Sequence, residues 1–313
     1  MCTQGPIVTN KAVVVSANPA MELVYTGDFS TSDEVVTADR SALISGGKAT
    51  NVARSLKTRS VLVCSTPYES GLSALYIDHL RQTAEMRFRG VPALESLRFS
   101  VVLVDDANPW QTRIVRTAGE ADPGAWTPFV AAVDEETAAG DVVVMSGSQP
   151  ASWPDSTYRK IVETAHLRAA RTAIDCTGGP LREALVAKPT LVKINRAEAS
   201  IALGLTDQSV DHLAAELVDR GAESAVVTDG PSAFAFADRS GRAETVEPRR
   251  EQPLAPTGAG DAFLASLVEA MMMRSGALDL QALERAAAAG AAAVRSLSSG
   301  VVDLPSVGST DGG

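Results

Sequence analysis

The 313-residue chain contains only three cysteines and three histidines. Cys2, Cys64 and Cys176 are far apart and odd in number, so they provide neither a disulfide framework nor the paired spacing of a zinc site. Free thiols in a reducing compartment are the expected state. The histidines are isolated and each falls in a helical run, which favours surface or core positions over metal binding or catalysis.

Long hydrophobic runs and an excess of basic charge are also missing. The most alanine-rich stretch, 286–294, lies between two arginines and is too short to span a bilayer. The first residues lack the charged start and long apolar run of a secretory signal. The 28 basic residues face 38 acidic ones, a formal net charge of −10, which excludes general affinity for nucleic acid or anionic membrane. We expect a cytoplasmic protein with neither partner.

What the chain does contain is a regular alternation of short apolar runs with longer amphipathic runs. The apolar runs end in Gly, Asp, Asn or Ser, which is typical of buried strands in a parallel sheet. Strands are predicted at 12–17, 61–65, 141–147, 172–176, 191–195 and 224–230. Helices are predicted at 48–58, 71–84, 124–139, 155–170, 180–187, 196–203, 209–220, 258–275 and 280–298. The alternation predicts a doubly wound α/β fold, with a mostly parallel sheet flanked by helices.

Two regions, 22–45 and 98–118, break this alternation. They contain strand-like segments without intervening helices, at 22–27, 34–44, 98–105 and 111–117, in which apolar and polar residues alternate. Such alternation is typical of a sheet with one solvated face. We expect one domain over residues 1–313, in which both regions form a small β-sheet lid over a ligand cleft at the carboxyl edge of the main sheet.

The segment PTGAGDAFLASLVEA, residues 256–270, is the most informative. Gly258, Ala259 and Gly260 lead into a strongly periodic helix, whose first N–H groups and dipole would form an anion site. Asp261 falls in the first turn, where it is placed to take a proton from a group that reacts with that anion. By spacing alone, a loop followed by a favourable first-turn acid is equally consistent.

The segment SGGKATNVARSL, residues 45–56, is also glycine-rich and enters a predicted helix. Gly46 and Gly47 would allow a polyhydroxylated ligand close to the backbone, and the Asn51 amide could bind its hydroxyls or a phosphate. A simple turn before a polar helix start is the alternative.

A third segment follows the predicted strand 191–195. Asn195 and Glu198 are three residues apart on a first helical turn and share a face. Their oxygen atoms suit Mg²⁺ held through water, although a helix cap with a first-turn acid explains the same pattern.

Taken in this order, the segments resemble the motifs of the PfkB (ribokinase-like) carbohydrate kinases over roughly residues 12–304. Residues 255–261, APTGAGD, are similar to the family's D-T-x-G-A-G-D, and 46–53, GGKATNVA, to its G-G-K-G-x-N-V-A. Asn195 and Glu198 match its N-x-x-E. SANPAME and MSGSQP further resemble the branch that phosphorylates sugar phosphates, which includes 1-phosphofructokinase, 6-phosphofructokinase of this type and tagatose-6-phosphate kinase.

The resemblance implies an ATP- and Mg²⁺-dependent kinase that often dimerises through its lid. Asp261 would be the general base, and the amides of residues 258–261 would hold the transferring phosphoryl group. Asn195 and Glu198 would organise Mg²⁺ and the nucleotide phosphates, and Thr228 and Gly230 would line the nucleotide side. The acceptor would be bound by Glu22, Gly46, Gly47, Asn51, Arg98 and Ser148.

The acceptor side departs from the family pattern. Glu22 stands where the family has Asp, Ala49 replaces a Gly, and the lid strand keeps Arg98 but lacks the family's following Asn. The base and the anion site of the family pattern are retained, so we expect phosphoryl transfer. The identity of the acceptor is not determined by these motifs. A phosphorylated ketohexose is favoured: fructose 1-phosphate, fructose 6-phosphate or tagatose 6-phosphate. An unphosphorylated sugar, nucleoside or other small alcohol is the alternative, and a non-catalytic nucleotide- or sugar-binding regulator is the third hypothesis.

Overall fold

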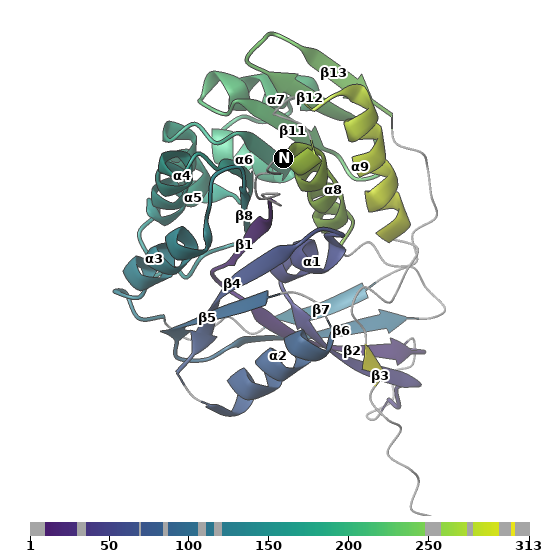
Figure 1. Cartoon of the computed structure of the whole chain (residues 1–313). Helices are drawn as coiled ribbons and strands as arrows, with labels where there is room; N and C mark the ends of the chain where they lie inside the picture. The colour runs from purple at the N-terminus through teal and green to yellow at the C-terminus, as the bar shows by residue number, and fades with distance from the viewer. Residues whose placement is uncertain are drawn as a thin grey trace, which may run out of the picture.

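Two β-sheets organise the chain (Figure 1), and the computed structural model describes residues 10–29, 36–68, 70–83, 87–105, 111–115, 121–247, 258–273, 278–293 and 302–303. The larger sheet contains β1 (Ala12–Ser16), β4 (Ser60–Pro67), β5 (Arg87–Leu94), β8 (Val142–Ser146), β9 (Arg171–Asp175), β10 (Leu191–Asn195), β11 (Ser224–Thr228), β12 (Phe234–Asp238) and β13 (Ala243–Val246). Their spatial order is β13-β12-β11-β10-β9-β8-β1-β4-β5. All pairs from β5 to β11 are parallel, and β12 and β13 continue the sheet antiparallel.

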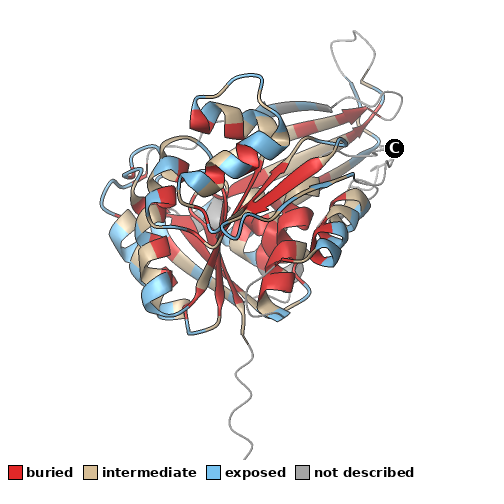
Figure 2. Cartoon of the chain, turned by 90° about the horizontal axis from the view of Figure 1, so that it is seen from above, coloured by how far each residue is buried: buried red, intermediate tan, exposed pale blue. Residues whose placement is uncertain are grey.

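Helices cover both faces of this sheet, so its central strands are buried, while β13 and the start of β5 are partly exposed (Figure 2). One face packs against α3 (Trp126–Glu136), α4 (Thr157–Leu167), α5 (Gly178–Val186), α6 (Arg196–Leu203) and α7 (Val210–Asp219). The other packs against α1 (Lys48–Ser55), α2 (Ser70–Thr83), α8 (Ala259–Met273) and α9 (Leu280–Ala293). In β1, Val13 and Val15 join the first core and Val14 joins the second, because successive side chains point to opposite faces.

The smaller sheet lies beside the main layer and contains β2 (Ala20–Gly27), β3 (Arg40–Gly46), β6 (Arg98–Asp105), β7 (Gln111–Val115) and β14 (Val302–Asp303). Its order is β14-β3-β2-β6-β7, and its central pair, β2 and β6, is parallel. These strands come from segments inserted after β1 and after β5, and from the end of the chain. The predicted doubly wound fold with a second small sheet is therefore confirmed.

Some predicted boundaries were wrong. The strand expected over 34–44 begins only at Arg40, which pairs with Thr26 near the end of β2. β5, β12, β13 and β14 were not predicted. Cys64 and Cys176 are free and buried. Cys2, lid residues 30–35, 106–110 and 116–118, motif residues 255–257, and predicted helix ends 84, 274–275 and 294–298 lie outside the described residues.

Within the described ranges, no helix combines the length and apolar character needed to cross a membrane.

Candidate active site

The strand order of the main sheet predicts where a ligand binds. From β1, the chain adds β4 and β5 on one side, and later adds β8 to β11 on the other. Ligands of doubly wound sheets bind at such a switch point, beyond the carboxyl ends of the strands. A cleft of about 930 Å³ lies there. The ends of β1, β8, β9, β10 and β11 contribute Ser16, Ser146, Asp175, Asn195 and Thr228 to its lining.

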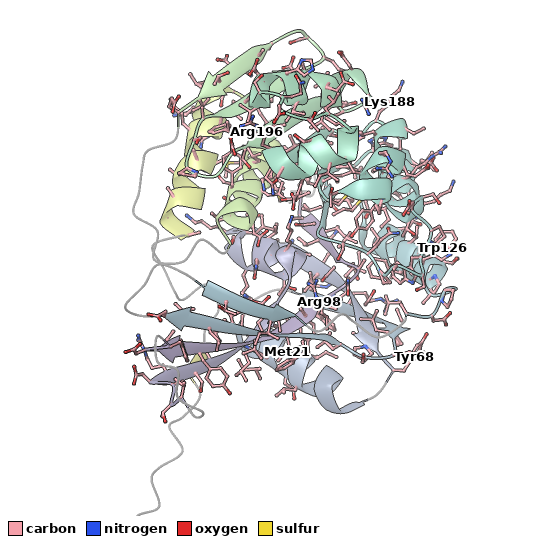
Figure 3. The ribbon with its side chains drawn as sticks, turned by 180° about the vertical axis from the view of Figure 1, so that it is seen from behind. Met21, Tyr68, Arg98, Trp126, Lys188 and Arg196 are labelled. Atoms are coloured by element: carbon pink, nitrogen blue, oxygen red, sulfur yellow. The ribbon has the colours of Figure 1, made fainter. Side chains whose placement is uncertain are left out.

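Most of the predicted site residues meet in this one cleft, although they are widely separated in sequence. Figure 3 shows Arg98 where the small sheet meets the main layer, and Arg196, another lining residue, high on the main layer. The predicted residues that line the cleft are Glu22, Gly47, Asn51, Arg98, Ser148, Asn195, Glu198, Thr228, Gly230, Gly258, Ala259, Gly260 and Asp261. Gly46 is absent from the lining. The small sheet therefore forms one wall of a cleft whose floor belongs to the main sheet.

The start of α8 presents to this cleft backbone amides that have no partner among the described residues. Gly258 has a φ of +92°, a conformation that favours glycine, and it turns the chain sharply into the helix. The Ala262 amide donates to the Gly258 carbonyl at 2.9 Å, so the amides of Ala259, Gly260 and Asp261 precede the hydrogen bonds within the helix. The positive end of the helix and these donors have the geometry that binds anions at helix starts, which we call the anion site.

The Asp261 carboxyl group lies at this helix start and is 7% exposed. Asn51 Nδ2 donates to Asp261 Oδ2 at 2.9 Å. Burial raises the Asp261 pKa to about 6; the Asn51 hydrogen bond opposes this, the charge of Asp175 adds to it, and Lys193 and Lys48 oppose it. A carboxylate with a pKa near neutrality, beside an anion site, is well suited to accept a proton.

A buried carboxylate beneath the anion site was not predicted as a site residue. Asp175 Oδ2 accepts from Lys193 Nζ at 2.8 Å, and Oδ1 accepts from Lys48 Nζ at 3.1 Å. Burial disfavours the ionised form of Asp175, but the charges of Lys193 and Lys48 outweigh burial and lower its pKa. A Cβ on Gly260 would lie 2.8 Å from Lys193 Nζ, so this ammonium group abuts the start of α8. The position of Asp175 at the end of a predicted strand was the signal that could have identified it.

Asn195 and Glu198 form the helix cap and first-turn acid that the sequence pattern also predicts for them. Asn195 Oδ1 accepts from the Glu198 amide at 2.8 Å and so caps α6. The Glu198 carboxylate accepts from Lys48 Nζ at 3.1 Å. No cluster of three His, Cys, Asp or Glu side chains that could hold a metal occurs in the part of the chain that the structure describes. One carboxylate still fits Mg²⁺, which binds proteins through one or two carboxylates together with phosphates and water.

The wall formed by the small sheet depends on the absence of a side chain at Gly46. A Cβ there would lie 2.5 Å from Glu22 Cγ and 2.6 Å from Glu22 Cδ. The longer carboxylate side chain at position 22 therefore fits because residue 46 is glycine. Gly46 supports Glu22 from β3, while Glu22 itself lines the cleft.

Several polar groups of the cleft have room for further hydrogen bonds. Asn18 Nδ2 donates to Ser148 Oγ at 3.1 Å. Among the described residues, Asn18 Oδ1, Ser146 Oγ and Gln149 Oε1 are buried without a hydrogen-bond partner. Buried polar atoms are nearly always paired, so a small movement of these side chains or a buried water would satisfy them.

The far end of the cleft is formed by the loop after β11. Gly230 has a φ of +56° and lines this end together with Thr228 and Asp229. Arg196 Nη1 donates to Asp229 Oδ2 at 3.1 Å and joins this loop to the start of α6. The loop is thus held against the helix that also carries Glu198.

Comparisons with known proteins identify the family and the fold of the chain. The model of the pfkB family carbohydrate kinases matches residues 10–306. The 1-phosphofructokinase of Bacillus subtilis (strain 168) is 27% identical over 259 residues, 81% of this chain and 83% of the relative. The fold is similar to that of a Thermotoga maritima protein described as a possible 1-phosphofructokinase, with a TM-score of 0.81, 20% identity and coverage of 94% and 95% of the two chains.

Escherichia coli phosphofructokinase-2 in complex with fructose-6-phosphate also has a similar fold, with a TM-score of 0.79, 20% identity and coverage of 92% and 94%. These solved structures support the fold, and the family match spans nearly the whole chain. The family model matches residues 10–306, which include the residues that line the cleft. The chain belongs to the pfkB family of carbohydrate kinases and is a phosphotransferase.

Proposed function

We propose that this kinase transfers the γ-phosphoryl group of ATP to a hydroxyl of a phosphorylated ketohexose, such as fructose 1-phosphate, fructose 6-phosphate or tagatose 6-phosphate. The observation that carries the proposal is the position of Asp261, a buried carboxylate with a raised pKa at a helix start with free amides. The curated relative is a 1-phosphofructokinase, which supports this acceptor class.

In the proposed reaction, Asp261 accepts the proton of the acceptor hydroxyl as its oxygen forms a bond to the γ-phosphorus. The bond from that phosphorus to the leaving ADP oxygen breaks. The free amides of residues 259–261 donate to the transferring group, and the nearby Lys193 ammonium adds positive charge. Asp261 later releases its proton to solvent, because its pKa of about 6 lies below neutral pH.

The acceptor would lie against the small sheet. Ala20 pairs with Arg98 and Glu22 pairs with Ser100, so Glu22 and Arg98 lie on the same face of neighbouring strands. A guanidinium group is well suited to a phosphate, and a carboxylate accepts hydrogen bonds from sugar hydroxyls. Gly47, Asn51 and Ser148 would complete the acceptor side.

The nucleotide would occupy the other end, against Thr228 and Gly230, with its phosphates directed toward Asn195. Glu198 would hold Mg²⁺, with Asn195 acting through water. When bound, this ion would neutralise phosphate charge that the protein's own cations do not reach. The Glu198 carboxylate now accepts from Lys48 Nζ at 3.1 Å, so Mg²⁺ would share this carboxylate with Lys48.

We further propose that residues 1–313 form one kinase domain, that the small sheet acts as its lid, and that two copies pair through this sheet. Leu43, Leu23, Val101 and Ile114 form one cross-strand row on the face opposite Glu22 and Arg98. Ile114 is 58% exposed. Leu43 packs against the second core, and the exposed end of the row at Ile114 supports association through this sheet.

Arg98→Ala tests the acceptor class. In an ATP-to-ADP coupled assay with Mg²⁺, we expect wild-type turnover with the three ketohexose phosphates and none with free ketohexoses, ribose or nucleosides. The variant should raise the KM for the phosphorylated acceptor about 10- to 100-fold, because one charged hydrogen-bonding group is removed. Arg89→Ala is the matched control, because Arg89 in β5 forms an exposed ion pair with Glu135 of α3. This variant should leave the acceptor KM unchanged. Turnover confined to unphosphorylated acceptors, with no effect of Arg98→Ala, would favour the second acceptor class instead.

Gly46→Ala is expected to raise the acceptor KM about tenfold or more, with little change in the KM for ATP. The added Cβ would displace Glu22 from the acceptor wall, as its distances of 2.5 and 2.6 Å from the Glu22 side chain require. Steady-state kinetics measures the effect. Gly71→Ala on α2 adds a Cβ that meets no atom within 4 Å and serves as the control. An equal effect of Gly46→Ala in a Glu22→Ala background would contradict this explanation.

A further inference from the structure

Arg54 is a largely buried cation on α1 that the proposed reaction does not use. It follows Asn51 by three residues, which places both side chains on the same face of the helix. Arg54 Nη1 donates to Asn51 Oδ1 at 3.3 Å, and Nη2 donates to Ser45 Oγ at 3.0 Å. Ser45 lies in β3 and is completely buried. The guanidinium group therefore joins the small sheet to the residue that contacts Asp261.

The donor and acceptor groups of Arg54, Asn51 and Asp261 determine how the Asn51 amide is oriented between its two partners. A guanidinium group has only donors, so it can bind only the oxygen end of the Asn51 amide. The NH₂ end must then point the other way, and its Nδ2 donates to Asp261 Oδ2 at 2.9 Å. An amide rotated by 180° would place its oxygen against the carboxylate, where two acceptors repel each other unless the carboxyl group is protonated.

Burial is the largest influence on the Arg54 pKa, and the neighbouring groups offset it only in part. Burial lowers the Arg54 pKa, and Tyr76 from α2, Glu22 from β2 and Asp261 from α8 oppose this. The charged groups that face Asp261 are Arg54 and Lys48 from α1, Asp175 from β9 and Lys193 from β10.

We infer that Arg54 is a positioning residue that holds the Asn51 amide with its NH₂ end toward Asp261, and thereby fixes the orientation of the base. The inference rests on the proposed function, in which Asp261 accepts the acceptor proton. It also implies a link between binding and catalysis, because Ser45 belongs to the sheet that carries the acceptor wall.

Arg54→Met tests the inference, since methionine keeps most of the aliphatic stem and removes the donors. We expect kcat to fall about 10- to 100-fold, as it does when a reacting group is slightly misplaced, while the acceptor KM changes less than about threefold. The acidic limb of the kcat–pH profile should move upward by about one pH unit, because the hydrogen bond that favours the Asp261 carboxylate is lost. Ser45→Ala removes only one anchor and should produce a smaller change in the same direction.

The decisive measurement is a double-mutant cycle. Because Arg54 acts through Asn51, Arg54→Met in an Asn51→Ala background should leave the acidic limb where Asn51→Ala alone puts it. A further shift of the same size in that background would mean that Arg54 acts by its charge alone, which overturns the inference. Arg54→Lys separates the two explanations again, because it keeps the charge without the fork that reaches both Ser45 and Asn51. Full rescue of the pH profile by lysine would also overturn it.

Failure of this inference can be distinguished from failure of the proposed function. If Asp261→Asn keeps full turnover, the base assignment is wrong. If Asp261→Asn is inactive but Arg54→Met matches the wild type in kcat and pH profile, only the role of Arg54 is wrong. If Arg54→Met does not fold, as judged by circular dichroism and ATP binding, Ser45→Ala carries the test: an unchanged kcat and pH profile in that variant would overturn the inference.

Discussion

Asp261→Asn is expected to lower kcat by about 10²- to 10⁴-fold, the range by which a positioned base accelerates proton transfer. The amide oxygen can still accept from Asn51, so the site should keep its shape, but it cannot take a proton from the acceptor. Binding of ATP and of the acceptor, measured by calorimetry, should stay close to wild type. A variant that retains full turnover would contradict the assignment of the base.

The same substitution should carry a pH signature. Burial raises the Asp261 pKa from 3.8 to about 6, so wild-type kcat should rise with pH through about 6. A folded-state pKa above the unfolded value means that protonated Asp261 favours folding at low pH, and that this advantage is lost as pH rises through 6. Asp261→Asn should therefore raise Tm at pH 8 and leave it nearly unchanged at pH 4. A lower Tm at pH 8 would show that the carboxylate stabilises the fold.

Asp175→Asn is expected to lower the free energy of unfolding by about 3–5 kcal/mol, because it removes one partner of a buried ion pair. The side chains of Lys193 and Asp175 are only 5% and 2% exposed. Without the carboxylate, Lys193 is left charged and buried beside the start of α8, and Lys48 keeps only Glu198. Activity should fall with stability, since both lysines lie at the anion site. Urea denaturation and the coupled assay measure the two effects.

Asp134→Asn is the matched control for this variant. The Asp134–Arg168 pair lies on the surface, with side chains 32% and 51% exposed, and its loss should cost less than about 1 kcal/mol. The pH dependence gives a second check. The Asp175 pKa is lowered from 3.8, so its contribution is present above that value and is lost as pH falls below it. The difference between wild type and Asp175→Asn should shrink in acid; a constant difference would argue against the ion pair as its cause.

The features that sequence analysis predicted well are those encoded locally. Gly258, Ala259, Gly260 and Asp261 are consecutive, so their arrangement at a helix start follows from the turn and the helix alone. Short apolar runs likewise predicted the strands of the parallel core. β13 was missed because AETV is short and contains polar residues, β12 because FAFAD contains no β-branched residue, and β5 because RFRGVPAL contains glycine and proline.

The features that could not be predicted depend on contacts between distant segments. Asp175 binds lysines from α1 and β10, and neither lysine could be assigned a role from its neighbours in sequence. The fit of Glu22 against Gly46 depends on the pairing of β2 with β3. The hydrogen bond from the Arg54 guanidinium group to Ser45 likewise depends on how β3 is placed beside α1.

The pairing of β2 with β6 has a consequence for biosynthesis. Ala20 pairs with Arg98, so the proposed acceptor wall joins segments separated by β3, α1, β4, α2 and β5. On the ribosome, the β2–β3 hairpin emerges long before its parallel partner, and contacts between such distant segments form slowly. Until β6 arrives, one edge of β2 is unpaired and open to association with other chains. The nascent chain therefore passes through a stage in which the sheet proposed to bind the acceptor has an open edge.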